Sequence, residues 1–135
     1  MALFQWRDEF SMKVPSIDAQ HHKLVDMLNA LHDGMVSGTA KEKMDPLLDG
    51  LIEYTATHFA HEEEYFATYQ YPDAEMHTQE HKKLVKDVLD FKEKFDSGRA
   101  SINMELMTFL KDWLLQHILG SDKAYSQHFV ERGAK

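Results

Sequence analysis

The chain contains no cysteine, and this absence excludes several kinds of structure at once. Without cysteine the chain forms no disulfide bond and offers no thiolate to a structural zinc ion or an iron–sulfur cluster. The N-terminal residues, MALFQWRDEF, also lack the basic and apolar regions of a secretory signal peptide. Both features fit a cytoplasmic protein, and this is the location that we expect.

Positive charge and long apolar runs are also scarce. The 135 residues include 15 Lys and Arg against 23 Asp and Glu, which gives a net charge of -8 with histidine neutral. A chain of this charge repels phosphate backbones and anionic lipids, so we expect neither a nucleic-acid partner nor a membrane partner. No apolar run approaches the roughly 20 residues that a membrane-spanning helix needs.

Glycine and proline are few, and they divide the chain into segments. Three breaks, SGTAKE, YQYPDAE and DSGRAS, separate four segments of helical length: 18–36, 41–66, 73–95 and 102–119. Short connections favour antiparallel neighbours, so the sequence predicts an all-α fold, an up-down-up-down antiparallel four-helix bundle. The length predicts a single domain over 1–135, with an N-terminal arm over 1–17 and the bundle over about 18–131.

Histidine is abundant, and its placement is informative. Residues three, four or seven positions apart share one face of a helix. By this rule each predicted helix directs at least one histidine toward its apolar face, and Glu62 lies one turn after one of them. The histidines on apolar faces are His21, His58, His77, His81 and His117. Five buried imidazoles without partners would cost much free energy, whereas metal ions would take up their lone pairs.

Other interpretations of these residues are weaker when the set is considered together. A single buried histidine is usually a hydrogen-bonded core residue, and a run of glutamates is usually a solvated surface. A zinc-protease HExxH motif would need histidine where Tyr65 stands. The ferritin-like pattern needs Glu-x-x-His pairs, and the chain has none. Imidazole with carboxylate suits iron, zinc, manganese or copper, and five histidines exceed the needs of one open metal site.

Four segments, in order, carry a family resemblance. IDAQHHKL, HFAHEEEYF, YPDAEMHTQEH and WLLQHILGSD resemble the metal-binding segments of hemerythrins, and of the single-domain bacteriohemerythrins in particular. The similarity extends from about Trp6 to Tyr125. An ordered set of this kind is far more specific than any single pair of histidines.

This resemblance implies a non-haem centre of two iron ions, bridged by an oxo or hydroxo group, with dioxygen as the ligand. It implies one iron bound by His77, His81 and His117, a second bound by His21 and His58, and Glu62 and Asp122 bridging the two. In the family, dioxygen binds at an open position on the iron with two histidines. The function it implies is reversible dioxygen binding for storage, delivery or buffering, which is not an enzymatic activity. A di-iron peroxidase or a nitric-oxide scavenging enzyme is the alternative. No protein partner is indicated, and we expect a monomer.

The last of these residues poses a geometric problem. Asp122 follows His117 by five positions, which is about 140° around an ideal α-helix. We predict a π-like widening or a local break near Gly120, which would bring both side chains to one side. Beside His117, we expect Trp113, Leu114 and Ile118 to supply an apolar lid for an oxygen pocket, although core packing explains them equally well. His22 lies off the apolar face, and we expect it at the surface.

Overall fold

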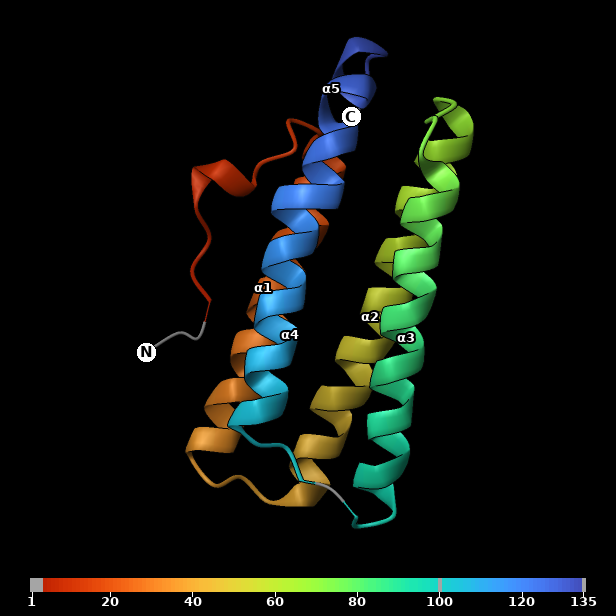
Figure 1. Ribbon diagram of the computed structural model, residues 1–135. Helices are drawn as coiled ribbons and strands as arrows, with labels where there is room; N and C mark the ends of the chain where they lie inside the picture. The colour runs from red at the N-terminus through yellow and green to blue at the C-terminus, as the bar shows by residue number, and fades with distance from the viewer. Residues whose placement is uncertain (1–3, 100, 135) are drawn as a thin grey trace.

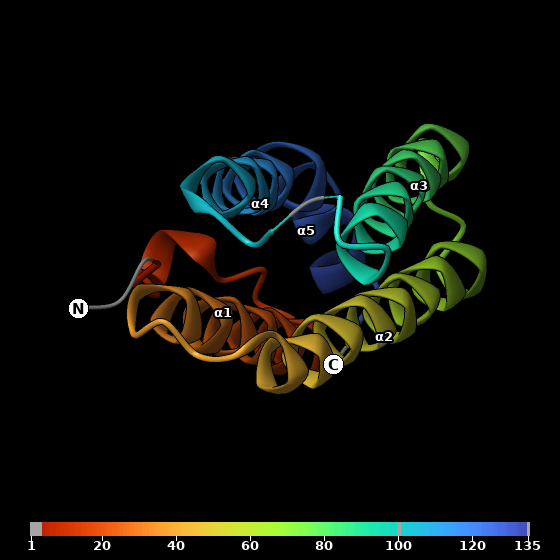
Figure 2. The same cartoon turned by 90° about the horizontal axis from the view of Figure 1, so that it is seen from below.

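The computed structural model describes residues 4–99 and 101–134, and within these ranges it contains helices and no strand. The long helices are α1 (Pro15–Val36), α2 (Lys41–Thr68), α3 (Ala74–Asp96) and α4 (Met104–Gln116). The shorter elements are a 3-10 helix (Asp8–Phe10), a π-helix (His117–Asp122) and α5 (Lys123–Glu131). The four long helices run alternately up and down (Figure 1), and the view along the bundle shows one at each corner (Figure 2). The predicted all-α antiparallel four-helix bundle is confirmed.

Glycines at the ends of α1 and α3 make the short connections possible. Gly38 and Gly98 adopt φ values of 70° and 79°, in the left-handed region that favours glycine. After each glycine the chain reverses, and a backbone N–H bonds back into the last turn. The bonds are Thr39 N to Gly34 O at 2.9 Å and Arg99 N to Lys94 O at 2.8 Å. These C-terminal caps satisfy carbonyl groups that the helices leave unpaired.

Two helices begin two or more residues away from the predicted positions, while α2 begins at the predicted residue and α3 one residue after it. α1 begins at Pro15 rather than at 18, because proline suits the first turn, where its missing N–H has no intrahelical partner. α4 begins at Met104 rather than at 102, because the side-chain oxygen of Asn103 accepts the N–H of Leu106 at 2.9 Å. Local capping chemistry therefore moved the boundaries without changing the number of helices in the bundle.

The described part of the N-terminal arm packs against the bundle. The side chain of Asn29, on α1, pairs with both backbone groups of Phe4, at 2.9 Å and 2.8 Å. Phe4 and Phe10 are buried, and their rings lie 5.4 Å apart. Residues 1–3 of the predicted arm lie outside the described residues.

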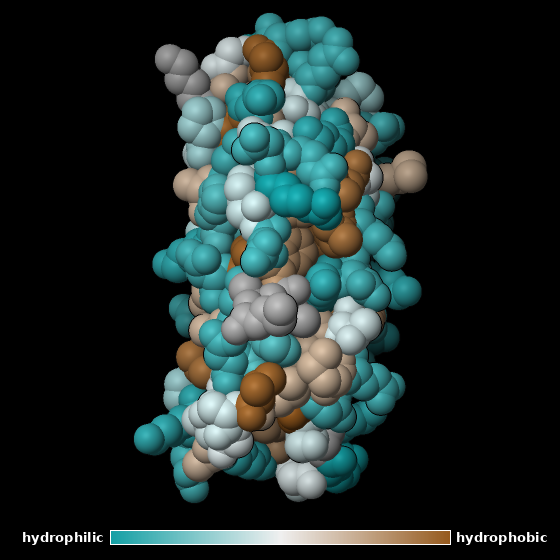
Figure 3. All heavy atoms as spheres, turned by 90° about the vertical axis from the view of Figure 1, so that its left-hand side faces the viewer, coloured by the Kyte–Doolittle hydropathy of each residue, from teal (hydrophilic) through white to brown (hydrophobic). Residues whose placement is uncertain are grey.

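The face of the molecule that carries the arm is mainly polar (Figure 3). Figure 3 shows the face that carries the arm, where hydrophobic side chains are scattered among hydrophilic ones. None of the helices in the described ranges is both long and apolar enough to cross a lipid bilayer. The apolar side chains gather instead along the inner faces of the helices, where they surround one polar cluster.

Candidate metal centre

The polar cluster consists of seven buried side chains. They are 0–5% exposed, and no other histidine or charged side chain is buried among the described residues. They are His21, His58, Glu62, His77, His81, His117 and Asp122. The structure therefore brings together all seven side chains that the resemblance implied.

The cluster draws on α1, α2, α3 and the π-helix that follows α4. His21 comes from α1, one turn of α2 separates His58 from Glu62, and one turn of α3 separates a pair of histidines. The fourth contribution comes from the π-helix, with His117 at its start and Asp122 at its end. In a π-helix the hydrogen bonds join residues five apart, so this spacing brings the two side chains to the same side. The predicted widening is confirmed.

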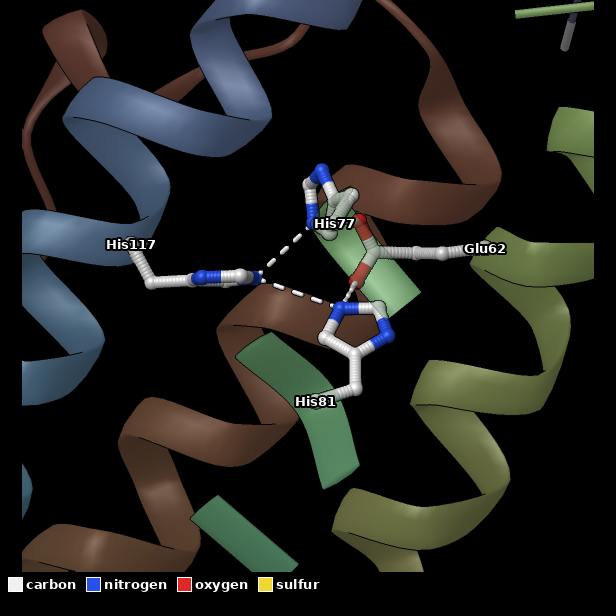
Figure 4. A group of neighbouring side chains, drawn as sticks. All are labelled: Glu62, His77, His81 and His117. Atoms are coloured by element: carbon white, nitrogen blue, oxygen red, sulfur yellow. Dashed lines mark hydrogen bonds and ion pairs between the residues drawn. The ribbon is translucent and has the colours of Figure 1, made fainter. Parts of the chain in front are cut away.

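The side chains form two overlapping groups, in each of which one atom per residue lies within 4.8 Å of the others. One group contains Glu62, His77, His81 and His117, and Figure 4 shows these four side chains converging. The other contains His21, His58, Glu62 and Asp122. One group thus has three imidazoles and the other has two.

Both carboxylates contact imidazoles of both groups. Glu62 Oε1 lies 2.9 Å from His58 Nε2 and 3.5 Å from His81 Nε2. Asp122 Oδ2 lies 3.1 Å from His21 Nε2, while its Oδ1 lies 2.9 Å from His77 Nε2. Each carboxylate therefore stands between the two groups, which is the position that a bridging ligand would need.

The two carboxyl groups stay charged in spite of their burial. Burial and the charge of Asp122 act to raise the pKa of Glu62, but contacts with His58 and other imidazoles outweigh them and lower this pKa to about 2. Burial likewise acts against the charge on Asp122, and the neighbouring imidazoles, His117 first, hold its pKa well below the usual range. Two anionic groups in a buried pocket make an environment that favours cations.

Three of the five imidazoles have an identifiable partner at Nδ1, the ring nitrogen that points away from the cluster. His81 Nδ1 lies 3.1 Å from Glu63 Oε2, and His117 Nδ1 lies 3.2 Å from Glu80 Oε2. His58 Nδ1 lies 2.6 Å from the side-chain oxygen of Gln20. Carboxylate and amide oxygens only accept, so the ring proton must sit on Nδ1. In the neutral ring, which is the form that binds a metal ion, Nε2 then faces the cluster as a lone pair.

These lone pairs show that the residues fit metal ions. Nε2 of His117 lies 3.0 Å from Nε2 of His77 and 3.3 Å from Nε2 of His81 (Figure 4). Among the described residues, the ion-pair contacts of the Glu62 and Asp122 oxygens are with imidazoles of the cluster. Buried lone pairs that face one another without a donor are costly, and a cation between them removes the cost. Nitrogen and oxygen donors without sulfur suit iron, zinc, manganese or copper.

Aromatic rings cover the outer sides of the three-histidine group. Phe59 stacks on His81 with ring centroids 3.7 Å apart, and Trp113 stacks on His117 at 4.3 Å. Tyr125 is fully buried and stacks on His77 at 5.5 Å. These rings fix the imidazole planes and keep water away.

A small cavity of about 50 Å³ lies beside the two-histidine group. Its lining includes both histidines of that group, His21 and His58, and the predicted pocket residues Trp113 and Leu114. The remaining wall residues are mostly aliphatic, among them Leu24, Leu28, Leu51, Ile52, Leu84, Val85, Val88 and Leu110. Ile118, also predicted for the pocket, is fully buried but does not line this cavity. It comes directly after His117, at a point where the helix has widened, and packs in the core instead.

Several residues around the cluster were not predicted as part of the site. Gln20, Glu63 and Glu80 each stand next in sequence to a cluster residue, and this adjacency is the signal that would have identified them. Phe59 and Tyr125 carry no comparable signal, because apolar rings in helices usually serve the core. His22, by contrast, is exposed as expected, and it stacks on Trp6 at 3.7 Å.

Comparisons with known proteins agree with this geometry. Residues 12–128 match the model of the hemerythrin HHE cation binding domain. A bacteriohemerythrin from Methylococcus capsulatus is 40% identical over 126 residues, which cover 93% of this chain and 95% of that protein. One from Stenotrophomonas maltophilia is 36% identical, and the match covers 93% of this chain and 81% of that protein.

Solved structures agree as well. The crystal structure of a wild-type hemerythrin superposes with a TM-score of 0.89 at 38% identity, covering 93% of this chain and 97% of that chain. An L114A mutant of hemerythrin gives a TM-score of 0.90 at 37% identity, covering 95% and 98%. With the fold, the polar cluster and the sequence all in agreement, the chain belongs to the hemerythrin family.

Proposed function

We propose that this chain binds dioxygen reversibly at a centre of two non-haem iron ions, for storage, delivery or buffering of oxygen. His77, His81 and His117 would hold one iron, and His21 and His58 the other. The carboxylates Glu62 and Asp122 would bridge the two ions. When bound, the iron pair would supply the electrons with which dioxygen is held.

The observation that carries this proposal is the unequal division of the imidazoles together with the position of the cavity. Three imidazoles and two carboxylates come close to filling the coordination sphere of one ion, whereas two imidazoles leave room on the other. The cavity lies against both imidazoles of the two-imidazole group, His21 and His58, and against only one imidazole of the other group, His117. A small apolar molecule would therefore meet the ion that has room for a ligand.

The lining of the cavity favours a carrier over an enzyme. Among the described residues that line it, the titratable side chains are His21, His58, His117 and Asp122, all of which belong to the proposed ligand set. The hydroxyl of Thr55 already donates to the carbonyl of Leu51 at 2.7 Å. Among the described lining residues, no acid or base outside the proposed ligand set stands ready to transfer a proton to a bound molecule, as enzymes that cleave or reduce oxygen species require.

The walls of the cavity would protect the bound gas from water. Leu114 and Trp113, both on α4, line it, and so does Phe59 on α2, whose ring lies 5.8 Å from that of Trp113. Apolar walls give water few hydrogen-bond partners, so they would disfavour water in the part of the cavity that they line. Water and external protons favour the loss of reduced oxygen from the site. Their exclusion would therefore keep the binding reversible.

The experiment is a cycle of oxygenation. The purified chain is loaded with ferrous iron under anaerobic conditions, exposed to air and then returned to an oxygen-free gas while its absorption spectrum is recorded. We expect two irons per chain and an absorption band that appears with oxygen and disappears without it. The His77→Ala, His81→Ala double variant is the control and should show neither.

Results of two kinds would overturn the proposal. One is a chain that retains no iron after gel filtration, or a spectrum that does not return when oxygen is removed. The other is sustained consumption of hydrogen peroxide or nitric oxide in the presence of a reductant, which would make the chain a di-iron enzyme.

A further inference from the structure

The two groups of imidazoles differ in the chemistry of their outer hydrogen-bond partners. In the three-histidine group, two Nδ1 atoms face carboxylates, Glu63 at 3.1 Å and Glu80 at 3.2 Å. In the two-histidine group, the one partner found among the described residues is the neutral amide of Gln20, at 2.6 Å from His58 Nδ1. The outer partners of the three-histidine group are therefore negatively charged, whereas the outer partner of the two-histidine group is neutral.

The carboxylate of Glu80 is held in place from two directions. Ser121 donates its hydroxyl to Glu80 Oε2 at 2.6 Å, and this same oxygen faces His117 Nδ1. Ser121 belongs to the π-helix, so Glu80 on α3 is tied to the segment that carries His117. This arrangement holds the Glu80 carboxylate in place beside the His117 imidazole.

A carboxylate that accepts the Nδ1 proton of an imidazole changes the basicity of Nε2, the atom that binds the metal. By accepting the Nδ1 proton, an anionic oxygen makes Nε2 a more basic donor than a neutral amide does. A more basic donor stabilises the higher charge of an oxidised metal ion more than that of the reduced ion. The two metal positions should therefore differ in their preference for the ferric state.

We propose that Glu63 and Glu80 are positioning residues that make the three-histidine group the stronger electron donor, while the neutral Gln20 leaves the two-histidine group the weaker one. The inference rests on the proposed iron centre. As a consequence, the ion in the three-histidine group would favour the oxidised state, and the ion in the two-histidine group would keep its capacity for an added ligand.

The test uses four single substitutions in the full chain. Glu63→Gln and Glu80→Gln replace the carboxylates by amides of similar shape, and Gln20→Glu makes the opposite change. Glu64→Gln is the matched control, because Glu64 is exposed on the same turn of α2 and contacts none of the five imidazoles in the described structure. For each variant we would measure iron per chain, the rate of iron loss to a chelator and the midpoint potential from a redox titration.

We expect Glu63→Gln and Glu80→Gln to raise the midpoint potential and to weaken metal binding by about 10- to 100-fold, as is usual when outer partners of metal ligands are removed. Gln20→Glu should lower the potential, and Glu64→Gln should leave it unchanged. A tenfold change in the ratio of ferric to ferrous affinity corresponds to about 59 mV for a one-electron couple. If a glutamine variant retains no iron, the midpoint potential of Gln20→Glu tests the inference instead: a lower potential than that of the wild type supports it, and an unchanged potential overturns it.

Equal potentials in all four variants would overturn the inference, and so would a shift in Glu64→Gln as large as that in Glu63→Gln, because net charge alone would then explain it. These results would leave the proposed function intact. A wild-type chain that binds no iron would overturn the proposed function and this inference with it. A chain that binds iron but not oxygen would overturn the proposed function alone.

Discussion

Removal of metal should lower the thermal stability of this protein substantially. Without a cation, the seven polar side chains of the cluster remain 0–5% exposed, and two carboxylates and five imidazoles are buried together. A metal that binds the folded chain and not the unfolded chain stabilises it by mass action. The perturbation is therefore complete removal of iron by a chelator under anaerobic conditions.

The magnitude follows from the size of the chain. At a free metal concentration about 100 times the dissociation constant, binding adds about 2.7 kcal/mol to the free energy of unfolding. The entropy of unfolding is about 2.1 cal/mol/K per residue, which for 135 residues is roughly 0.28 kcal/mol/K. Loss of the metal should then lower the melting temperature by about 10 °C.

Circular dichroism at 222 nm during heating measures this shift, with the iron content determined on the same samples. The His77→Ala, His81→Ala double variant is the control, since a chain that holds little metal should melt at the same temperature with and without chelator. The reasoning would be refuted by an unchanged melting temperature of the wild-type chain after verified removal of iron. A shift of equal size in the double variant would refute it as well.

Three further predictions concern the bundle away from the cluster. Leu48→Ala should destabilise the chain by about 2–5 kcal/mol in urea denaturation, since Leu48 is fully buried, while Leu47→Ala, at a residue 38% exposed, should change stability by less than about 0.5 kcal/mol. Gly50→Ala should raise the melting temperature through a gain of up to about 1 kcal/mol, because the added Cβ would lie 3.5 Å from the nearest atom, an ordinary contact; a lower melting temperature would contradict this. Lys92→Met should destabilise the chain by an amount that depends on pH. Burial acts to lower the pKa of Lys92, but hydrogen bonds to three aspartates, Asp45 first, raise it above its usual 10.5, and they lower that of Asp45 below 3.8. The difference in free energy of unfolding between wild type and variant should therefore be constant between pH 3.8 and pH 10.5. It should decrease as the pH rises through the raised pKa of Lys92, and also as the pH drops through the lowered pKa of Asp45. A difference that does not vary with pH would show that the charges contribute nothing.

The helices and their inner faces could be predicted from the sequence because both depend on local patterns. Periodic apolar residues, interrupted by short segments with glycine or proline, indicated four helices, and the antiparallel arrangement followed from the short connections. The candidate cluster could be predicted for the same reason, since one turn of helix separates His58 from Glu62 and another separates His77 from His81. The π-helix between His117 and Asp122 was also predictable, but only from the family resemblance, because five-residue spacing on an ordinary helix would have placed these side chains apart.

Tertiary structure decided which neighbours surround the cluster. Glu63 contacts His81 from another helix, 18 positions away, and Gln20 contacts His58 across 38 positions. Glu62 and Glu64 illustrate the difference, since both belong to one run of glutamates, yet the first is fully buried and the second is exposed. Sequence by itself determined which side chains each helix directs inward, because that depends on an angle of rotation along one helix. The outer hydrogen bonds and the walls of the cavity depend on the distances between helices, and only packing of the whole bundle sets those distances.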